Sequence, residues 1–131
     1  MTYRLRIFLS RAFVKFVRKE RMSTRRLLQV FEDLHNGNID VDYGGGVIKQ
    51  RIARSAEGKS GGYRAVIYYR KGDKTFFMHG FSKKDKENID EKEEKELKKQ
   101  ARIMLGFTDD QIEILIKLGK FKRVIYDEEN L

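Results

Sequence analysis

The spacing of apolar and polar positions changes twice along the chain. In the first part of the chain, this spacing predicts a strand followed by two helices. Residues 3–9 alternate loosely, as a strand does. Ser10 can cap a short helix, and Ser23 or Thr24 a second one, because a side-chain oxygen accepts hydrogen bonds from the free N–H groups of a first turn. Gly37 is placed to end the second helix. The apolar stripes of these helices are Phe13, Phe16 and Val17, and then Leu27, Leu28, Phe31 and Leu34.

The middle of the chain carries strand signals instead. β-Branched and aromatic residues concentrate there, and glycines interrupt them. Asn36-Gly37-Asn38 and Gly44-Gly45-Gly46 indicate a turn and a loop. Gly72-Asp73 is a connection short enough for an antiparallel hairpin. The predicted strands are residues 47–54, 63–71 and 74–81.

A helical period returns after residue 84 and predicts two more helices. Each begins with a residue that can cap it and that has Glu or Gln three positions later, the spacing of a capping box. Each is followed by a glycine that can end it. The cap, its partner and the final glycine are Asp90, Glu93 and Gly106 in the first helix and Thr108, Gln111 and Gly119 in the second. Residues 121–126 are expected to return as a strand.

Together these elements predict a single α+β domain over residues 1–131. We expect N-terminal helices packed on a small twisted antiparallel sheet, with C-terminal helices completing the domain. The length suits one domain with its own core. No repeat or proline-rich linker divides the chain.

The composition removes several classes of protein and site. The chain has no cysteine, which excludes disulfides, thiolate nucleophiles and cysteine-based zinc sites. Its apolar runs are shorter than the roughly 18–20 residues that span a bilayer. Residues 1–10 alternate arginine with apolar residues and lack the apolar stretch of a signal peptide. We therefore expect a cytoplasmic protein that makes no membrane association.

Positive charge gathers in the middle third of the chain. Of the total net charge of +9, residues 44–84 hold 10 Lys and Arg against 2 acidic residues, whereas residues 85–131 hold 10 against 13. A local field of this sign attracts phosphate backbones, anionic membranes or acidic proteins. We regard nucleic acid as the first of these candidates.

Familiar phosphate and metal sites do not fit the sequence. Gly58-Lys59-Ser60 resembles the end of a phosphate-binding P-loop, but the glycine that this motif needs is replaced by Ala53. The two histidines, His35 and His79, are far apart and have no carboxylate pair at ligand spacing. His35 stands near a helix end, where an imidazole interacts favourably with the helix dipole. We expect neither a cofactor nor a catalytic metal.

Cations on the predicted strands are the remaining candidates. Lys49 and Arg51 are two residues apart, so they project from one face of a strand, with Ile48 and Ile52 on the other face. Neighbouring strands would bring such side chains to one basic surface. The alternative is that each is a surface cation that confers solubility or protects a strand edge. The further members of the set are Arg64, which opens the next strand, and Lys83 and Lys84, which follow the third.

Such a set of cations could cleave RNA by transesterification. The ribose 2′-OH loses a proton and attacks the adjacent phosphorus, and the 5′-oxygen that leaves needs a proton. Arginines can stabilise the charge that develops on the phosphate, and a lysine crowded by other cations can exchange the protons. His79 is an alternative acid or base, although alternation with Phe77 and Phe81 predicts that it is buried.

Three stretches of sequence resemble the RelE/HigB-like toxins of type II toxin–antitoxin systems. They are residues 45–54, the Gly-Lys-Ser-Gly-Gly-Tyr-Arg segment at residues 58–64, and residues 79–89, which contain Gly-Phe-Ser-Lys-Lys-Asp-Lys-Glu-Asn-Ile. The resemblance covers about residues 20–118. It implies helices against a twisted antiparallel sheet, cleavage of messenger RNA, often on a translating ribosome, and a cognate antitoxin that covers the basic surface.

The resemblance also suggests roles for individual residues. Lys49 and Arg51 stand where the family has two basic residues on a strand that faces the RNA, and Arg64 stands at the arginine that contacts the scissile phosphate. The candidate catalytic residues are Lys49, Arg51, Arg64, Lys83 and Lys84, and the candidate RNA-binding residues are Arg54, Lys59, Tyr63 and Lys86. Some members place a catalytic tyrosine or histidine near the following helix or the chain end. That role is left unassigned, Tyr126 included.

Two other functions fit the same residues. The chain could be a module that binds RNA or ribosomes without cutting, in which case Tyr63 and Tyr68 could stack on single-stranded bases. The alternative role of both tyrosines is packing in the sheet. The chain could also be a structural partner whose basic surface an acidic protein neutralises. New RNA ends after incubation with translating ribosomes would separate cutting from binding.

Overall fold

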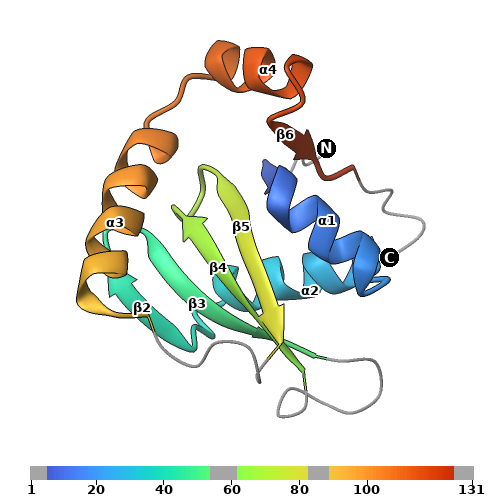
Figure 1. The fold of residues 1–131 in the computed structure, drawn as a ribbon, viewed down its shortest axis with the longest axis vertical. Helices are drawn as coiled ribbons and strands as arrows, with labels where there is room; N and C mark the ends of the chain where they lie inside the picture. The colour runs from blue at the N-terminus through green and yellow to red at the C-terminus, as the bar shows by residue number, and fades with distance from the viewer. Residues whose placement is uncertain (1–5, 54–61, 83–88, 126–131) are drawn as a thin grey trace.

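The computed structural model describes residues 6–53, 62–82 and 89–125, which form four helices around a six-stranded sheet (Figure 1). The sheet has the order β2-β3-β4-β5-β1-β6. The strands are β1 (Ile7–Ser10), β2 (Val41–Gly44), β3 (Val47–Ile52), β4 (Tyr63–Tyr69), β5 (Thr75–Ser82) and β6 (Phe121–Arg123). The helices are α1 (Arg11–Lys19), α2 (Thr24–His35), α3 (Glu91–Leu105) and α4 (Asp109–Lys117). None of these helices is long and apolar enough to cross a membrane.

The sheet is mixed, whereas the sequence pattern predicted an antiparallel one. β1 runs parallel to β5, with Phe8 beside Phe76, and every other neighbouring pair is antiparallel. A parallel neighbour requires a long connection, and here residues 11–74 lie between the two strands. β2 was not predicted either. It is a short, mostly exposed edge strand that contains Asp42 and Gly44, two residue types that strands disfavour.

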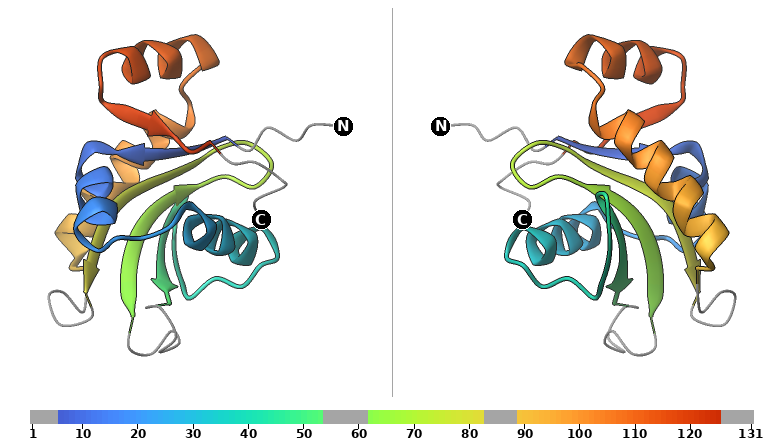
Figure 2. Two further views of the ribbon diagram at one scale, coloured as in Figure 1. Left: turned by 90° about the vertical axis from the view of Figure 1, so that its right-hand side faces the viewer. Right: turned by 90° about the vertical axis from the view of Figure 1, so that its left-hand side faces the viewer.

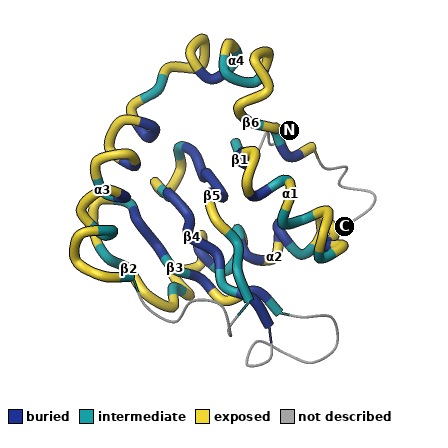
Figure 3. Tube along the Cα trace, in the orientation of Figure 1, coloured by how far each residue is buried: buried dark blue, intermediate teal, exposed yellow. Residues whose placement is uncertain are grey.

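Helices cover both faces of the sheet, and each face has its own apolar core (Figures 2 and 3). The first core joins α1 and α2 to the sheet and includes Phe13, Leu34 and Phe77. The second core joins α3 and α4 to the opposite face and includes Tyr68 and Leu97. Alternation along the strands therefore decides which helices a side chain meets.

The predicted helix starts are confirmed. The side chains of Ser10, Ser23 and Asp90 each accept a hydrogen bond from the backbone N–H three residues on. Thr108 and Gln111 form a complete capping box at the start of α4. The Ser10 hydroxyl also donates to the Met78 carbonyl oxygen at 2.6 Å, which fixes the start of α1 against β5. Short-range sequence signals thus determine where the helices begin.

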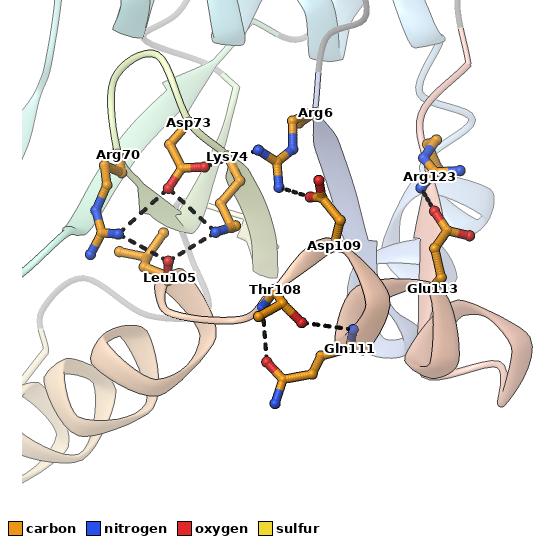
Figure 4. A network of polar contacts seen from close by, with 10 residues as sticks. All are labelled: Arg6, Arg70, Asp73, Lys74, Leu105, Thr108, Asp109, Gln111, Glu113 and Arg123. Atoms are coloured by element: carbon orange, nitrogen blue, oxygen red, sulfur yellow. Dashed lines mark hydrogen bonds and ion pairs between the residues drawn. The ribbon is translucent and has the colours of Figure 1, made fainter.

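The hairpin between β4 and β5 holds the end of α3 in place (Figure 4). The buried Lys74 Nζ donates to the Leu105 carbonyl oxygen at 2.9 Å and lies 3.3 Å from Asp73 Oδ2. Arg70 Nη1 donates to the same carbonyl at 3.0 Å. Cations at a helix C-terminus satisfy its free carbonyl groups and interact well with its dipole. Arg6 bridges Asp73 to Asp109, which ties the first turn of α4 to the same network.

Candidate nucleic-acid interface

Two neighbouring strands place three of the predicted cations on one face of the sheet. β3 carries Lys49 and Arg51, and β4 pairs with it so that Arg64 lies directly opposite Arg51. Residues opposite each other in an antiparallel pair share a face, with Cβ atoms about 4.5–5.5 Å apart. Lys49, Arg51 and Arg64 therefore form one group, here called the cation face.

The residues between these cations show which face it is. Ile48 and Ile52 belong to the first core, under α1 and α2, as does Ala65 beside Arg64. The cations consequently project from the opposite face, which α3 covers over Val47 and Tyr68. The Arg51 side chain is 50% exposed, and Lys49 and Arg64 are half-buried. The three cations therefore lie on the same face of the sheet as α3, in a part of that face that is accessible to solvent.

β5 adds His79 and Phe81 to this face. A Cβ on Gly80 would lie 2.3 Å from the Phe16 ring, so Gly80 faces α1 and its two neighbours face the other way. In the register, His79 is opposite Val66, and Phe81 is opposite Arg64.

His79 is exposed, and the prediction that it is buried was wrong. The pairing shifts at this point, because Ile67 is opposite Phe77 whereas Val66 is opposite His79. The extra residue between them is Met78. A bulge of this kind breaks strict alternation, so Phe77 enters the first core while His79 lies on the cation face.

The buried side chain of Gln50 positions Asp40, which in turn contacts Arg51. Gln50 is fully buried; its Nε2 donates to the Asn38 carbonyl oxygen at 2.7 Å, and its Oε1 accepts from the Asp40 N–H at 3.1 Å. This fixes Asp40 beside β3. The Asp40 carboxylate accepts from the Arg51 backbone N–H, and its Oδ1 lies 4.0 Å from Arg51 Nε. Sequence reasoning missed this support, because both contacts depend on the pairing of β2 with β3.

Tyr63 lies on the other side of the sheet, which contradicts its predicted role in stacking on RNA. It is only 6% exposed and belongs to the first core. Its hydroxyl donates to Glu20 Oε2 at 2.8 Å, and its ring meets Phe16 edge-on with centroids 5.3 Å apart. The alternation that brings Arg64 to the cation face necessarily turns its neighbour Tyr63 inward.

Tyr68 also has a packing role. It is fully buried, and its hydroxyl donates to Gln100 Oε1 at 2.6 Å, which joins β4 to α3. Burial raises the pKa of Tyr68 to about 12. Neither of the two tyrosines considered for base stacking presents its ring to solvent.

Several predicted site residues lie outside the described residues. They are Arg54, Lys59, Lys83, Lys84 and Lys86, together with Tyr126. The segments 54–61 and 83–88 connect to the described chain just beyond Ile52 and Ser82, which flank Tyr63 in the register. Both segments are therefore attached at the end of the sheet that carries Arg51 and Arg64.

The described residues contain no group of three or more histidine, aspartate or glutamate side chains that could hold a metal ion. What this face offers is positive charge from two arginines and one lysine, with an imidazole at its border. Planar guanidinium groups in this arrangement suit a phosphodiester.

Comparison with known proteins identifies the family. A comparison with curated proteins found no matching sequence. The family model described as "RelE toxin of RelE / RelB toxin-antitoxin system" matches residues 5–124, which include every described residue of the sheet and the cation face. The α+β arrangement found here is consistent with that family. The chain therefore belongs to the RelE toxin family, the toxins of RelE/RelB toxin–antitoxin systems.

Proposed function

We propose that this toxin is a metal-independent endoribonuclease that cuts messenger RNA on the ribosome and so inhibits translation. The observation that carries the proposal is the direct pairing of Arg51 with Arg64. Like charges placed opposite each other destabilise a sheet, so this pair weakens the free protein. An anion bound between the two guanidinium groups relieves the repulsion.

The arginine pair fits the chemistry of RNA cleavage. Attack of the 2′-oxygen on phosphorus places extra negative charge on the non-bridging oxygens. Arg51 and Arg64 can donate to these oxygens from two strands, and preorganised donors of this kind stabilise a transition state more than a ground state. Asp40 supports the proposal because it restricts where the Arg51 side chain can lie.

We also propose that the remaining predicted cations contact the RNA on either side of the cleavage site. We assign Arg54, Lys59 and Lys86 to contacts with the phosphate backbone, and Lys83 or Lys84 to the scissile region. Their segments are attached at the arginine end of the sheet. Phosphate contacts of this type position a nucleic acid without reading its sequence.

Membership of the family also supports a protein partner. We propose that a cognate antitoxin binds this chain and covers the cation face. An acidic segment would neutralise the repulsion between Arg51 and Arg64 as a phosphate does. Co-expression with the product of the neighbouring gene should then restore growth and retain a stable complex during purification.

Expression in growing cells tests the nuclease. We expect growth arrest and new messenger ends, and purified toxin with translating ribosomes should give the same ends in EDTA. Arg64→Ala should abolish the cutting without unfolding the protein, whereas Arg102→Ala, which removes an exposed charge from α3, should leave it unchanged. Salt-dependent ribosome binding without new ends would favour the non-catalytic binding module.

A further inference from the structure

Two groups that can carry protons stand on either side of Val66. The register places Lys49 opposite Val66 from β3 and His79 opposite Val66 from β5. All three residues share the cation face. Neighbouring strands are about 4.8 Å apart, so the backbones of Lys49 and His79 are separated by about 10 Å.

The space between them lies next to the arginine pair. Arg64 is two residues from Val66 on the same strand and face, and Arg51 is opposite Arg64. Val66 itself is only 4% exposed and forms an apolar floor. A phosphate gripped by the two arginines would therefore lie with Lys49 on one side and His79 on the other.

We propose that His79 is the general base and Lys49 the general acid of the cleavage, acting from opposite sides of the scissile phosphate. This inference rests on the proposed nuclease function. The division follows from the chemistry of the two groups, because an imidazole can accept a proton and a lysine ammonium group can donate one. In-line displacement needs the two groups on opposite sides of the phosphorus, and the register supplies that arrangement.

The reaction step balances with these residues alone. The neutral imidazole of His79 takes the proton of the 2′-OH as the 2′-oxygen forms its bond to phosphorus. The bond from phosphorus to the 5′-oxygen breaks, and the ammonium of Lys49 gives that oxygen its proton. The products are a 2′,3′-cyclic phosphate and a 5′-hydroxyl, and His79 returns its proton to the solvent while Lys49 regains one.

The chain offers a matched control for His79. Its only other histidine is His35, which ends α2, is exposed like His79, and stacks on Phe31 with ring centroids 6.1 Å apart. His35 therefore lies with the helices of the first core, across the sheet from the cation face. His79→Gln and His35→Gln remove the same chemical group from the two faces.

A messenger with sulfur in place of the bridging 5′-oxygen at the mapped cleavage site tests the two roles. A thiolate leaves without a proton, so the sulfur bypasses the general acid but not the general base. On the ordinary messenger, bound to ribosomes, His79→Gln and Lys49→Gln should each slow cutting at least about a hundredfold, with His35→Gln unchanged. On the sulfur messenger, Lys49→Gln should recover to within about tenfold of the unaltered toxin, and His79→Gln should stay slow.

The other outcomes contradict either the roles assigned to His79 and Lys49 or the proposed nuclease function. Undiminished cutting of the ordinary messenger by His79→Gln would remove His79 from the reaction. Recovery of His79→Gln alone would reverse the two roles, and recovery of neither variant would remove the acid role of Lys49. If the unaltered toxin cuts neither messenger, the nuclease proposal itself fails. Thermal unfolding of each variant confirms that the fold is intact.

Discussion

At the scale of single residues, the proposed function requires that the cation face binds phosphate, and the same cations lie close together in the free protein. Arg51 lies directly opposite Arg64 in one strand pair, and like charges in that position disfavour the pairing of strands. Stability and activity should therefore respond in opposite directions when one arginine is neutralised.

The variant Arg64→Gln tests whether stability and cutting activity change in opposite directions. We expect the free energy of unfolding at low salt to stay the same or to rise by up to about 1 kcal/mol, because the like-charge contact is gone. Messenger cutting should fall at least about a hundredfold. Chemical denaturation and end mapping measure the two effects. A clear loss of stability, in line with the loss of cutting, would instead make Arg64 a structural residue.

Asp40 should act on the RNA only through Arg51. Asp40→Asn keeps an acceptor for the Arg51 N–H but removes the charge beside its guanidinium, so cutting should fall about tenfold through misplacement of that group. In an Arg51→Gln background the same change should have no further effect. Asp42→Asn is the control, because the Asp42 carboxylate accepts from the Gly44 N–H at 2.9 Å and not from β3. Additive losses of cutting in the double variant would contradict the claim that Asp40 acts through Arg51.

Gly80 is required for the contact between α1 and β5. A methyl group there would meet the Phe16 ring at 2.3 Å. Gly80→Ala should therefore lower the free energy of unfolding by about 1–3 kcal/mol, as overpacking does. Gly80 is not one of the glycines with positive φ, so the contact with Phe16 is the expected source of the loss. Unchanged stability of Gly80→Ala in chemical denaturation would contradict the prediction.

At the scale of elements, the sequence predicted what depends on neighbours in the chain. Ser10, Ser23, Asp90 and Thr108 begin helices as expected, because a cap needs only the next three residues. The hairpin around Gly72 was also predicted. Its turn residues and flanking aromatic residues are adjacent in sequence.

Features that depend on distant residues could not be predicted in the same way. The parallel pairing of β1 with β5 joins segments nearly 70 residues apart. The bulge beside Met78 is visible only once β4 and β5 are paired, and it moves His79 from the predicted core to the cation face. For the site, alternation correctly placed Lys49 with Arg51, but the position of Arg64 opposite Arg51 required the register.

The Tyr68 hydroxyl joins two elements and makes stability depend on pH. Its pKa is about 12 in the folded protein and about 10 when the chain is unfolded. The folded state therefore keeps its proton where the unfolded state loses it, so stability present below pH 10 falls as pH rises to about 12, by roughly 3 kcal/mol. Denaturation at several pH values should show a smaller fall for Tyr68→Phe than for the unaltered chain. Parallel curves would contradict the prediction.

At the scale of the whole molecule, the two faces of the sheet differ in the charge that they present to solvent. Both apolar cores contribute stability, and the face under α3 also continues into the cation face. The Lys74 network anchors α3 at the opposite end of that face, at Leu105. The helix can thus be held firmly without covering Arg51 and Arg64.

The chemistry of the RNA ends tests the central claim most directly. Purified toxin is incubated with translating ribosomes in EDTA, and the newly formed ends are identified chemically. Attack by the 2′-oxygen predicts a 2′,3′-cyclic phosphate on one fragment and a 5′-hydroxyl on the other, with both lost in Arg64→Ala. Fragments with a 5′-phosphate and a 3′-hydroxyl, or cutting that survives Arg64→Ala, would contradict cleavage by this group of cations.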